Sequence, residues 1–252
     1  MANENIIEVE NLCCLSGSQF LLNNISWQVK RGEQWVVFGR NGCGKTTLLS
    51  IIAGYKSYSS GKVKVFGEEY TKDNILDIRK RIGWVSSSFF DKTYTQESVF
   101  DIVISALTGA MGRDFNVSNK DIAKARLLLE SLGLKTKIDS SFTTLSKGER
   151  QNVLIARAFM TNPEIMILDE PATGLDVLAR RELWQVIRSL RGRVTVILTT
   201  HYLEEAEALS DRIGILSHGR LRICGTAQEL CAAAGETRFE EAFIKLAGEG
   251  AQ

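Results

Sequence analysis

The residues best suited to chemistry in this sequence form a glycine-rich loop that ends in a lysine and a threonine. Gly39 and Gly44 enclose four residues, and Lys45 and Thr46 follow directly. Glycines let the backbone curl so that several N–H groups face one point and bind phosphate oxygens. The lysine can reach the β- and γ-phosphates of a nucleotide, and the threonine hydroxyl can bind Mg²⁺. The pattern predicts a nucleoside triphosphate site, with ATP as the expected nucleotide.

We expect the whole loop and the start of the next helix to contact the nucleotide: Gly39, Arg40, Asn41, Gly42, Cys43, Gly44, Lys45, Thr46 and Thr47. Lys45 is also expected to act in catalysis, because its charge can stabilise a transferred phosphoryl group. Cys43 has two interpretations. It is either a small residue that fits the loop, or a thiol made reactive by the helix N-terminus.

Three further polar side chains follow buried strands of the expected sheet. Asp169 and Glu170 come directly after an apolar run at 165–168, and His201 follows another at 194–198. Ligands of open α/β folds bind at the carboxyl ends of strands. We therefore expect Asp169 to bind Mg²⁺, Glu170 to act as general base and His201 to contact the γ-phosphate. The alternatives are a pair of solvated charges and a structural histidine.

Alternating strand and helix patterns are expected to position these residues. Strands are expected at residues 6–9, 25–29, 35–38, 63–66, 81–85, 165–168 and 194–198, and helices at 46–53, 99–107, 122–132, 177–190, 202–209 and 238–247. Such alternation predicts an α/β fold with a parallel sheet. The helical stretch between about 95 and 160 is an insertion into that sheet, and residues 212–224 form a hairpin that turns at His218.

Composition limits the classes of function. The 252 residues are 44% apolar and 24% charged, with a net charge of +1. Near-neutral charge argues against broad binding to nucleic acid or anionic lipid. No apolar run approaches the ~20 residues that a spanning helix needs. Five irregularly spaced cysteines indicate neither a disulfide framework nor a zinc site. We expect a cytoplasmic protein that does not insert into a membrane, so another polypeptide must supply any membrane part.

Two more motifs complete a recognisable set. Leu145-Ser146-Lys147-Gly148-Glu149 precedes an apolar helix pattern, and Gly174-Leu175-Asp176 follows the acidic pair. In this order, the motifs resemble those of the ATPase subunits of ABC transporters over essentially the whole chain. The resemblance implies one P-loop NTPase domain of ABC-cassette type over residues 1–252, with a mixed sheet and an N-terminal antiparallel β part. It further implies a nucleotide-binding core at 1–87 and 161–252 and a helical subdomain at about 88–160.

The resemblance also implies an assembly. Two copies are expected to form a head-to-tail homodimer in which Ser146, Gly148 and Asp176 of one copy complete the ATP site of the other. The implied activity is Mg²⁺-dependent ATP hydrolysis coupled to transport through a separate transmembrane permease, at the inner face of the cell membrane. Segments 199–209 and 239–243 resemble ATPases of exporters, so export is slightly favoured. Segment 82–88 resembles a small group of stand-alone ATPases.

Three departures from the family pattern stand out. Lys147 replaces a glycine and Glu149 a glutamine, and Lys147 either faces the partner's γ-phosphate or is solvated. Ser87 stands where the family has a glutamine that contacts Mg²⁺, so we assign Ser87 as a metal ligand with a shorter reach. Ser16 takes the place of an aromatic residue that stacks on adenine, with Phe20 the nearest aromatic. The preference for ATP over GTP is therefore left open.

An aromatic segment leaves two interpretations open. Phe89, Phe90 and Tyr94 either line the groove that receives a helix of the permease or pack inside the helical subdomain. On the docking interpretation, Phe90→Ala should spare ATP hydrolysis and impair transport. Two other functions remain as alternatives: a soluble ABC-type ATPase, and a nucleotide sensor that hardly hydrolyses. The sequence names neither the cargo nor the membrane subunit.

Overall fold

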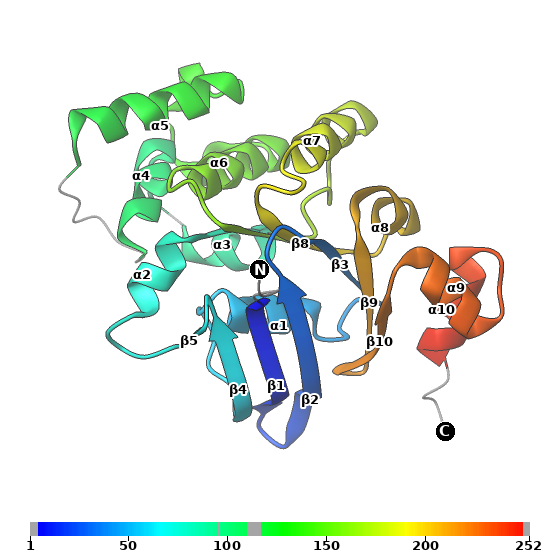
Figure 1. Ribbon diagram of the computed structural model, residues 1–252. Helices are drawn as coiled ribbons and strands as arrows, with labels where there is room; N and C mark the ends of the chain where they lie inside the picture. The colour runs from blue at the N-terminus through cyan, green and yellow to red at the C-terminus, as the bar shows by residue number, and fades with distance from the viewer. Residues whose placement is uncertain (1–4, 95, 110–116, 249–252) are drawn as a thin grey trace. The chain divides into compact units, whose positions relative to one another are not determined.

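The computed structural model describes residues 5–94, 96–109 and 117–248 (Figure 1). The chain forms two compact units, one made of Met1–Tyr70 with Val186–Gln252 and the other of Thr71–Gln185. Each unit has buried apolar residues of its own.

An antiparallel sheet occupies the N-terminal part of the first unit. Its order is β2-β1-β4-β5, with β1 (Asn5–Ser16), β2 (Gln19–Lys30), β4 (Ser60–Val65) and β5 (Glu68–Glu69). Along β2, buried residues alternate with exposed ones from Ile25 onward, as one face of the strand packs on the core. The expected N-terminal antiparallel β part is confirmed.

The first unit also contains parallel strands. β3 (Gln34–Phe38) pairs in parallel with β8 (Thr195–Thr200) and β9 (Arg212–Ser217), and β10 (Arg220–Gly225) pairs antiparallel with β9. Every residue of β3 and β8 is buried, which explains the apolar runs at their centres. The helices of this unit are α1 (Lys45–Ile52), α8 (Leu203–Leu209), α9 (Ala227–Ala234) and α10 (Phe239–Gly248). The mixed sheet is therefore confirmed.

The second unit is built on two parallel strands, β6 (Ile82–Ser86) and β7 (Ile165–Asp169), whose last residues are partners in the register. Both strands are fully buried. The helices are α2 (Ile75–Lys80), α3 (Ser87–Thr93), α4 (Val99–Ile104), α5 (Asn119–Ser131) and α6 (Lys147–Phe159), with 3₁₀ turns at Ser105–Thr108, Lys135–Lys137 and Phe142–Thr144. α7 (Val177–Ser189) includes the point where the chain returns to the first unit.

Every strand and helix expected from the sequence is present, and three helices were missed: α2, α3 and α9. The first two are only six and seven residues long. α9 carries clear signals at both ends, a capping box of Thr226 with Glu229 and a left-handed Gly235. The expected subdomain boundaries at 88 and 160 stay a prediction, because the compact units divide at other residues.

Candidate functional site

The glycine-rich loop links β3 to α1, as the sequence predicts. Gly42 and Gly44 have φ angles of 80° and 110°, which side-chain-bearing residues rarely adopt. A Cβ on Gly39 would lie 2.3 Å from the carbonyl oxygen of Leu216 and 2.8 Å from the Cys43 sulfur. The loop therefore needs its glycines both for its turn and for close approach to β9.

The Lys45 side chain is hydrogen-bonded to the backbone of the glycine-rich loop. Its Nζ donates hydrogen bonds to the carbonyl oxygens of Gly39 at 2.9 Å and Arg40 at 3.3 Å, and the side chain is 5% exposed. A charge held over the loop backbone is well placed to meet phosphate oxygens. Thr46 is exposed and Thr47 half-buried, so the Thr46 hydroxyl is accessible to a metal ion.

The turn between β9 and β10 braces the loop. The amide of Gly219 donates to the carbonyl of Cys43 at 2.9 Å, and the amide of Asn23 donates to the carbonyl of Gly219 at 2.8 Å. His218 lies in this turn with φ 47°, so its position is explained by the hairpin. Cys43 is buried. This burial favours the first interpretation of Cys43, as a small residue that fits the loop.

A cavity lies against the outer edge of the loop. Its volume is about 450 Å³, and its lining comes from the loop, the β9–β10 turn and α10, including Arg40, Cys43, His218 and Phe243. No pattern in the sequence indicates that α10, so late in the chain, lines a cavity together with the loop.

The acidic pair lies at the carboxyl end of β7 in the second unit. Asp169 is buried, and its Oδ2 accepts a hydrogen bond from Ser86 Oγ at 2.9 Å. Glu170 is half-buried and has φ 48°. A left-handed glutamate costs about 1–2 kcal/mol, and such strain concentrates at functional sites.

Ser86 and Gln151, which sequence reasoning did not single out, are hydrogen-bonded to two of the expected site residues, Asp169 and Ser87. Ser87, the expected metal ligand, donates from Oγ to Gln151 Oε1 at 2.9 Å, while Ser86 contacts Asp169. A signal for Gln151 was available. It is a polar residue on the apolar face of α6, three and seven positions before the buried Leu154 and Ala158.

His201 follows β8 in the first unit and is exposed, with its ring centroid 4.2 Å from that of Tyr202. The preceding residue, Thr200, donates to the buried carboxylate of Glu205 at 2.6 Å and accepts from the amide of Tyr202 at 3.0 Å. These bonds fix the backbone where β8 ends, so they hold His201 at the strand's carboxyl end.

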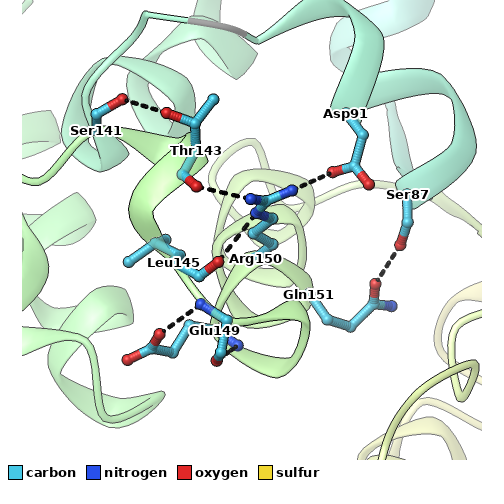
Figure 2. Close-up of polar contacts among 9 residues, drawn as sticks. Ser87, Asp91, Ser141, Thr143, Leu145, Glu149, Arg150 and Gln151 are labelled. Atoms are coloured by element: carbon cyan, nitrogen blue, oxygen red, sulfur yellow. Dashed lines mark hydrogen bonds and ion pairs between the residues drawn. The ribbon is translucent and has the colours of Figure 1, made fainter.

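Ser146 and Asp176 both cap helices. Ser146 Oγ accepts from the Glu149 amide at 3.3 Å, and Glu149 Oε2 accepts from the Ser146 amide at 2.8 Å (Figure 2). The hydrogen bond from the Ser146 backbone lowers the pKa of Glu149, with smaller contributions from the Ser146 hydroxyl and Lys137. Asp176 Oδ1 accepts from the amides of Leu178 and Ala179 at 2.9 Å.

Part of the segment 145–149 is exposed. Ser146 and Lys147 are exposed, and Gly148 is half-buried at the first turn of α6. A Cβ on Gly148 would meet only Leu175 Cδ2, at 3.8 Å. Glu149, which replaces a glutamine, retains the capping function through its carboxylate.

The donor set suits Mg²⁺ rather than a metal held by the protein alone. The part of the chain that the structure describes contains no group of three histidine, cysteine or acidic side chains able to hold a metal. Mg²⁺ is usually bound by one or two protein oxygens together with substrate phosphates and water. The Thr46 hydroxyl in the first unit and the buried Asp169 carboxylate in the second are each an oxygen donor of this kind.

Comparisons with known proteins agree with this geometry. Residues 22–173 match the family described as ABC transporter. The chain is 35% identical to the uncharacterized ABC transporter ATP-binding protein YlmA of Bacillus subtilis, covering 89% of this chain and 87% of that protein.

The names of two other relatives state opposite directions of transport. The spermidine/putrescine import ATP-binding protein PotA of Spiroplasma citri is 33% identical over 90% of this chain and 63% of its own length. The Nod factor export ATP-binding protein I of a Rhizobium species is 36% identical over 81% of this chain and 65% of its own length. Similarity therefore does not choose between import and export.

Solved structures share the fold. An ATP-binding subunit of an ABC transporter aligns with a TM-score of 0.79 and 25% identity, over 96% of this chain and 99% of that one. A bacterial ABC transporter cassette solved as a dimer aligns with a TM-score of 0.75 and 24% identity, over 87% and 98%. The fold is that of a P-loop ATPase cassette.

Proposed function

Because the chain belongs to the ABC transporter family, as one of its ATP-binding proteins, we propose that it binds Mg²⁺-ATP and hydrolyses it to energise a transporter. The observation that carries the proposal is Lys45, buried over the carbonyls of its own glycine-rich loop. A buried ammonium in a glycine-rich loop at a helix N-terminus is suited to a polyphosphate.

Each expected site residue has a role in this proposal. Residues Gly39 to Thr47 bind the phosphates, and Thr46 and Asp169 hold Mg²⁺. Glu170 accepts a proton from the attacking water, and His201 contacts the γ-phosphate. Bound Mg²⁺ would neutralise charge on the phosphates. Ser87 contributes at the same strand end through its contact with Gln151.

We further propose that two copies bind ATP head to tail. Support comes from Ser146 and Gly148, which expose the N-terminal turn of α6, a turn with partial positive charge. Asp176 would contribute from the partner copy. A related cassette has been solved as a dimer.

A separate membrane permease is the proposed second partner. Among the described residues, no helix is both long and apolar enough to cross a bilayer. The proposed place of work is the cytoplasmic face of the membrane, through this permease. The preference for export rests only on segments 199–209 and 239–243 and stays a prediction.

The test is nucleotide binding and phosphate release by purified protein. Lys45→Ala should weaken Mg²⁺-ATP binding by at least about tenfold, since it removes a charged hydrogen-bond donor. Lys56→Ala, which removes an exposed lysine beyond α1, is the matched control and should bind as wild type does. Equal binding by all three proteins would refute the proposed site.

The nucleotide sensor is the remaining alternative, and turnover separates it. Wild-type protein that binds Mg²⁺-ATP tightly but releases no phosphate above background, alone and with its permease, would favour the sensor. The strained, half-buried Glu170 at the end of β7 favours hydrolysis.

A further inference from the structure

The buried amide of Gln151 has one hydrogen-bonding atom that no described residue satisfies. Gln151 lies in the first half of α6 and is 4% exposed. Its Oε1 accepts from Ser87 Oγ at 2.9 Å, whereas its Nε2 has no partner among the described residues. Buried polar atoms nearly always have a partner, so this atom calls for water or a bound group.

Ser87, the partner of Gln151, follows the strand end at which Asp169 lies. Ser86 and Asp169 are register partners at the last position of β6 and β7, and their side chains are hydrogen-bonded. Ser87 and Glu170 are the next residues along the two chains. The hydrogen bond to Ser87 therefore holds the Gln151 amide near the end of β6, whose last residue pairs with Asp169.

Ser87 and Gln151 together span the reach of one longer side chain. In a glutamine at position 87, Cγ would replace the serine oxygen, and the terminal amide atoms would lie about 2.4 Å beyond it by standard bond lengths. Gln151 Oε1 lies 2.9 Å from Ser87 Oγ. The amide of Gln151 thus lies at nearly the distance that the amide of a glutamine at position 87 would reach.

A second contact between α3 and α6 keeps this pair together (Figure 2). Arg150 Nη1 lies 3.7 Å from Asp91 Oδ1, and its other nitrogens donate to the carbonyls of Leu145 at 3.1 Å and Thr143 at 2.7 Å. Arg150 thus joins α3 to the segment before Ser146. The Ser87–Gln151 bond also links these helices, and its amide nitrogen has no partner among the described residues.

We propose that Gln151 is a positioning residue that supplies from α6 the amide that residue 87 lacks, and that its free atom binds a water molecule of bound Mg²⁺. The serine hydroxyl both donates and accepts, so a half-turn of the Gln151 amide leaves Oε1 free to accept from that water. Ser87 then acts through Gln151 instead of contacting the metal. This inference rests on the proposed function, because it needs a Mg²⁺-nucleotide at the site.

The test exchanges the two side chains. Gln151→Ala, Ser87→Ala and the double variant Ser87→Gln/Gln151→Ala are compared with wild type and with Asn152→Ala. Asn152 is the matched control, since it is the neighbouring amide on α6 and bonds instead to the Leu132 carbonyl at 3.1 Å. The readout is the Mg²⁺ concentration that half-maximally strengthens binding of a fluorescent ATP analogue, with thermal unfolding measured in parallel.

Both alanine variants should raise the half-saturating Mg²⁺ concentration about 3- to 10-fold, the range expected for one lost hydrogen bond. The double variant should return it to within about twofold of wild type, and Asn152→Ala should not change it. Unchanged Mg²⁺ dependence in Gln151→Ala would overturn the inference while the proposed function stands. A loss that the double variant fails to recover would show a structural role only and would also overturn it. Wild type that binds no nucleotide would overturn both.

Discussion

Replacing Phe90 with alanine tests which interpretation of the aromatic segment is right. Phe90 is fully buried in the second unit, so the docking interpretation of this residue is wrong and core packing is correct. Its ring is stacked on Tyr94 at 5.3 Å, lies 5.2 Å from the rings of Trp84 and Phe89, and has Arg157 above it at 4.8 Å.

The structure sets the size of the effect. Removing a buried phenylalanine costs about 3–5 kcal/mol. For a chain of this length, each 1 kcal/mol shifts the melting temperature by about 2–4 °C. Phe90→Ala should therefore lower it by roughly 6–20 °C, and ATP hydrolysis should fall at temperatures where the variant begins to unfold.

The assay is thermal unfolding followed by circular dichroism, with ATP hydrolysis measured well below the transition. Leu127→Ala is the control, because Leu127 is an apolar residue of the same unit that is 67% exposed, and it should shift the midpoint by less than about 2 °C. A Phe90→Ala protein as stable as wild type but defective only in transport would refute the packing argument and restore the docking interpretation.

Three other predictions follow from single contacts. Gly39→Ala should destabilise the loop and weaken ATP binding by at least about tenfold, because the new Cβ would lie 2.3 Å from the Leu216 carbonyl oxygen. Gly248→Ala is the control: its Cβ would have no neighbour within 4 Å, so it should match wild type in binding titrations. Folding lowers the pKa of Glu149, so its charge stabilises the cap above the unfolded pKa, and this contribution is lost as pH falls through the folded pKa. Glu149→Gln should therefore lose less stability on acidification than wild type does, as read from melting curves at several pH values. An unchanged pH profile would count against the capping role. Cys43 should react with iodoacetamide only when the chain is unfolded, as read by peptide mass spectrometry, and rapid labelling of native protein that ATP prevents would contradict this.

Much of the fold could be predicted because its strands are buried on both faces. β3, β7 and β8 are buried strands that each contain a run of apolar residues. Asp169 is the last residue of β7 and His201 directly follows β8, whereas Lys45 follows β3 after the glycine-rich loop. The order of these runs and loops locates Lys45, Asp169 and His201 at strand ends without any knowledge of side-chain contacts.

What could not be predicted depends on contacts between residues far apart in sequence. Helix α3 is seven residues long, and its aromatic residues read equally as a groove or as core. The Ser87–Gln151 hydrogen bond joins residues 64 positions apart, and no local sequence pattern predicts it. Ser87 was assigned to Mg²⁺ by position alone, whereas in the structure its hydroxyl is engaged by Gln151. That ligand assignment stays a prediction, and we favour an indirect role.

The measurement that tests the central claim most directly is phosphate release by Glu170→Gln beside wild type, with ATP binding measured on the same preparations. A general base contributes about 10²- to 10⁴-fold to the rate. We expect Glu170→Gln to bind Mg²⁺-ATP at least as tightly as wild type and to release phosphate at least about 100-fold more slowly. Equal turnover by the two proteins would contradict the assignment of this chain as an ATPase that uses the acidic end of β7.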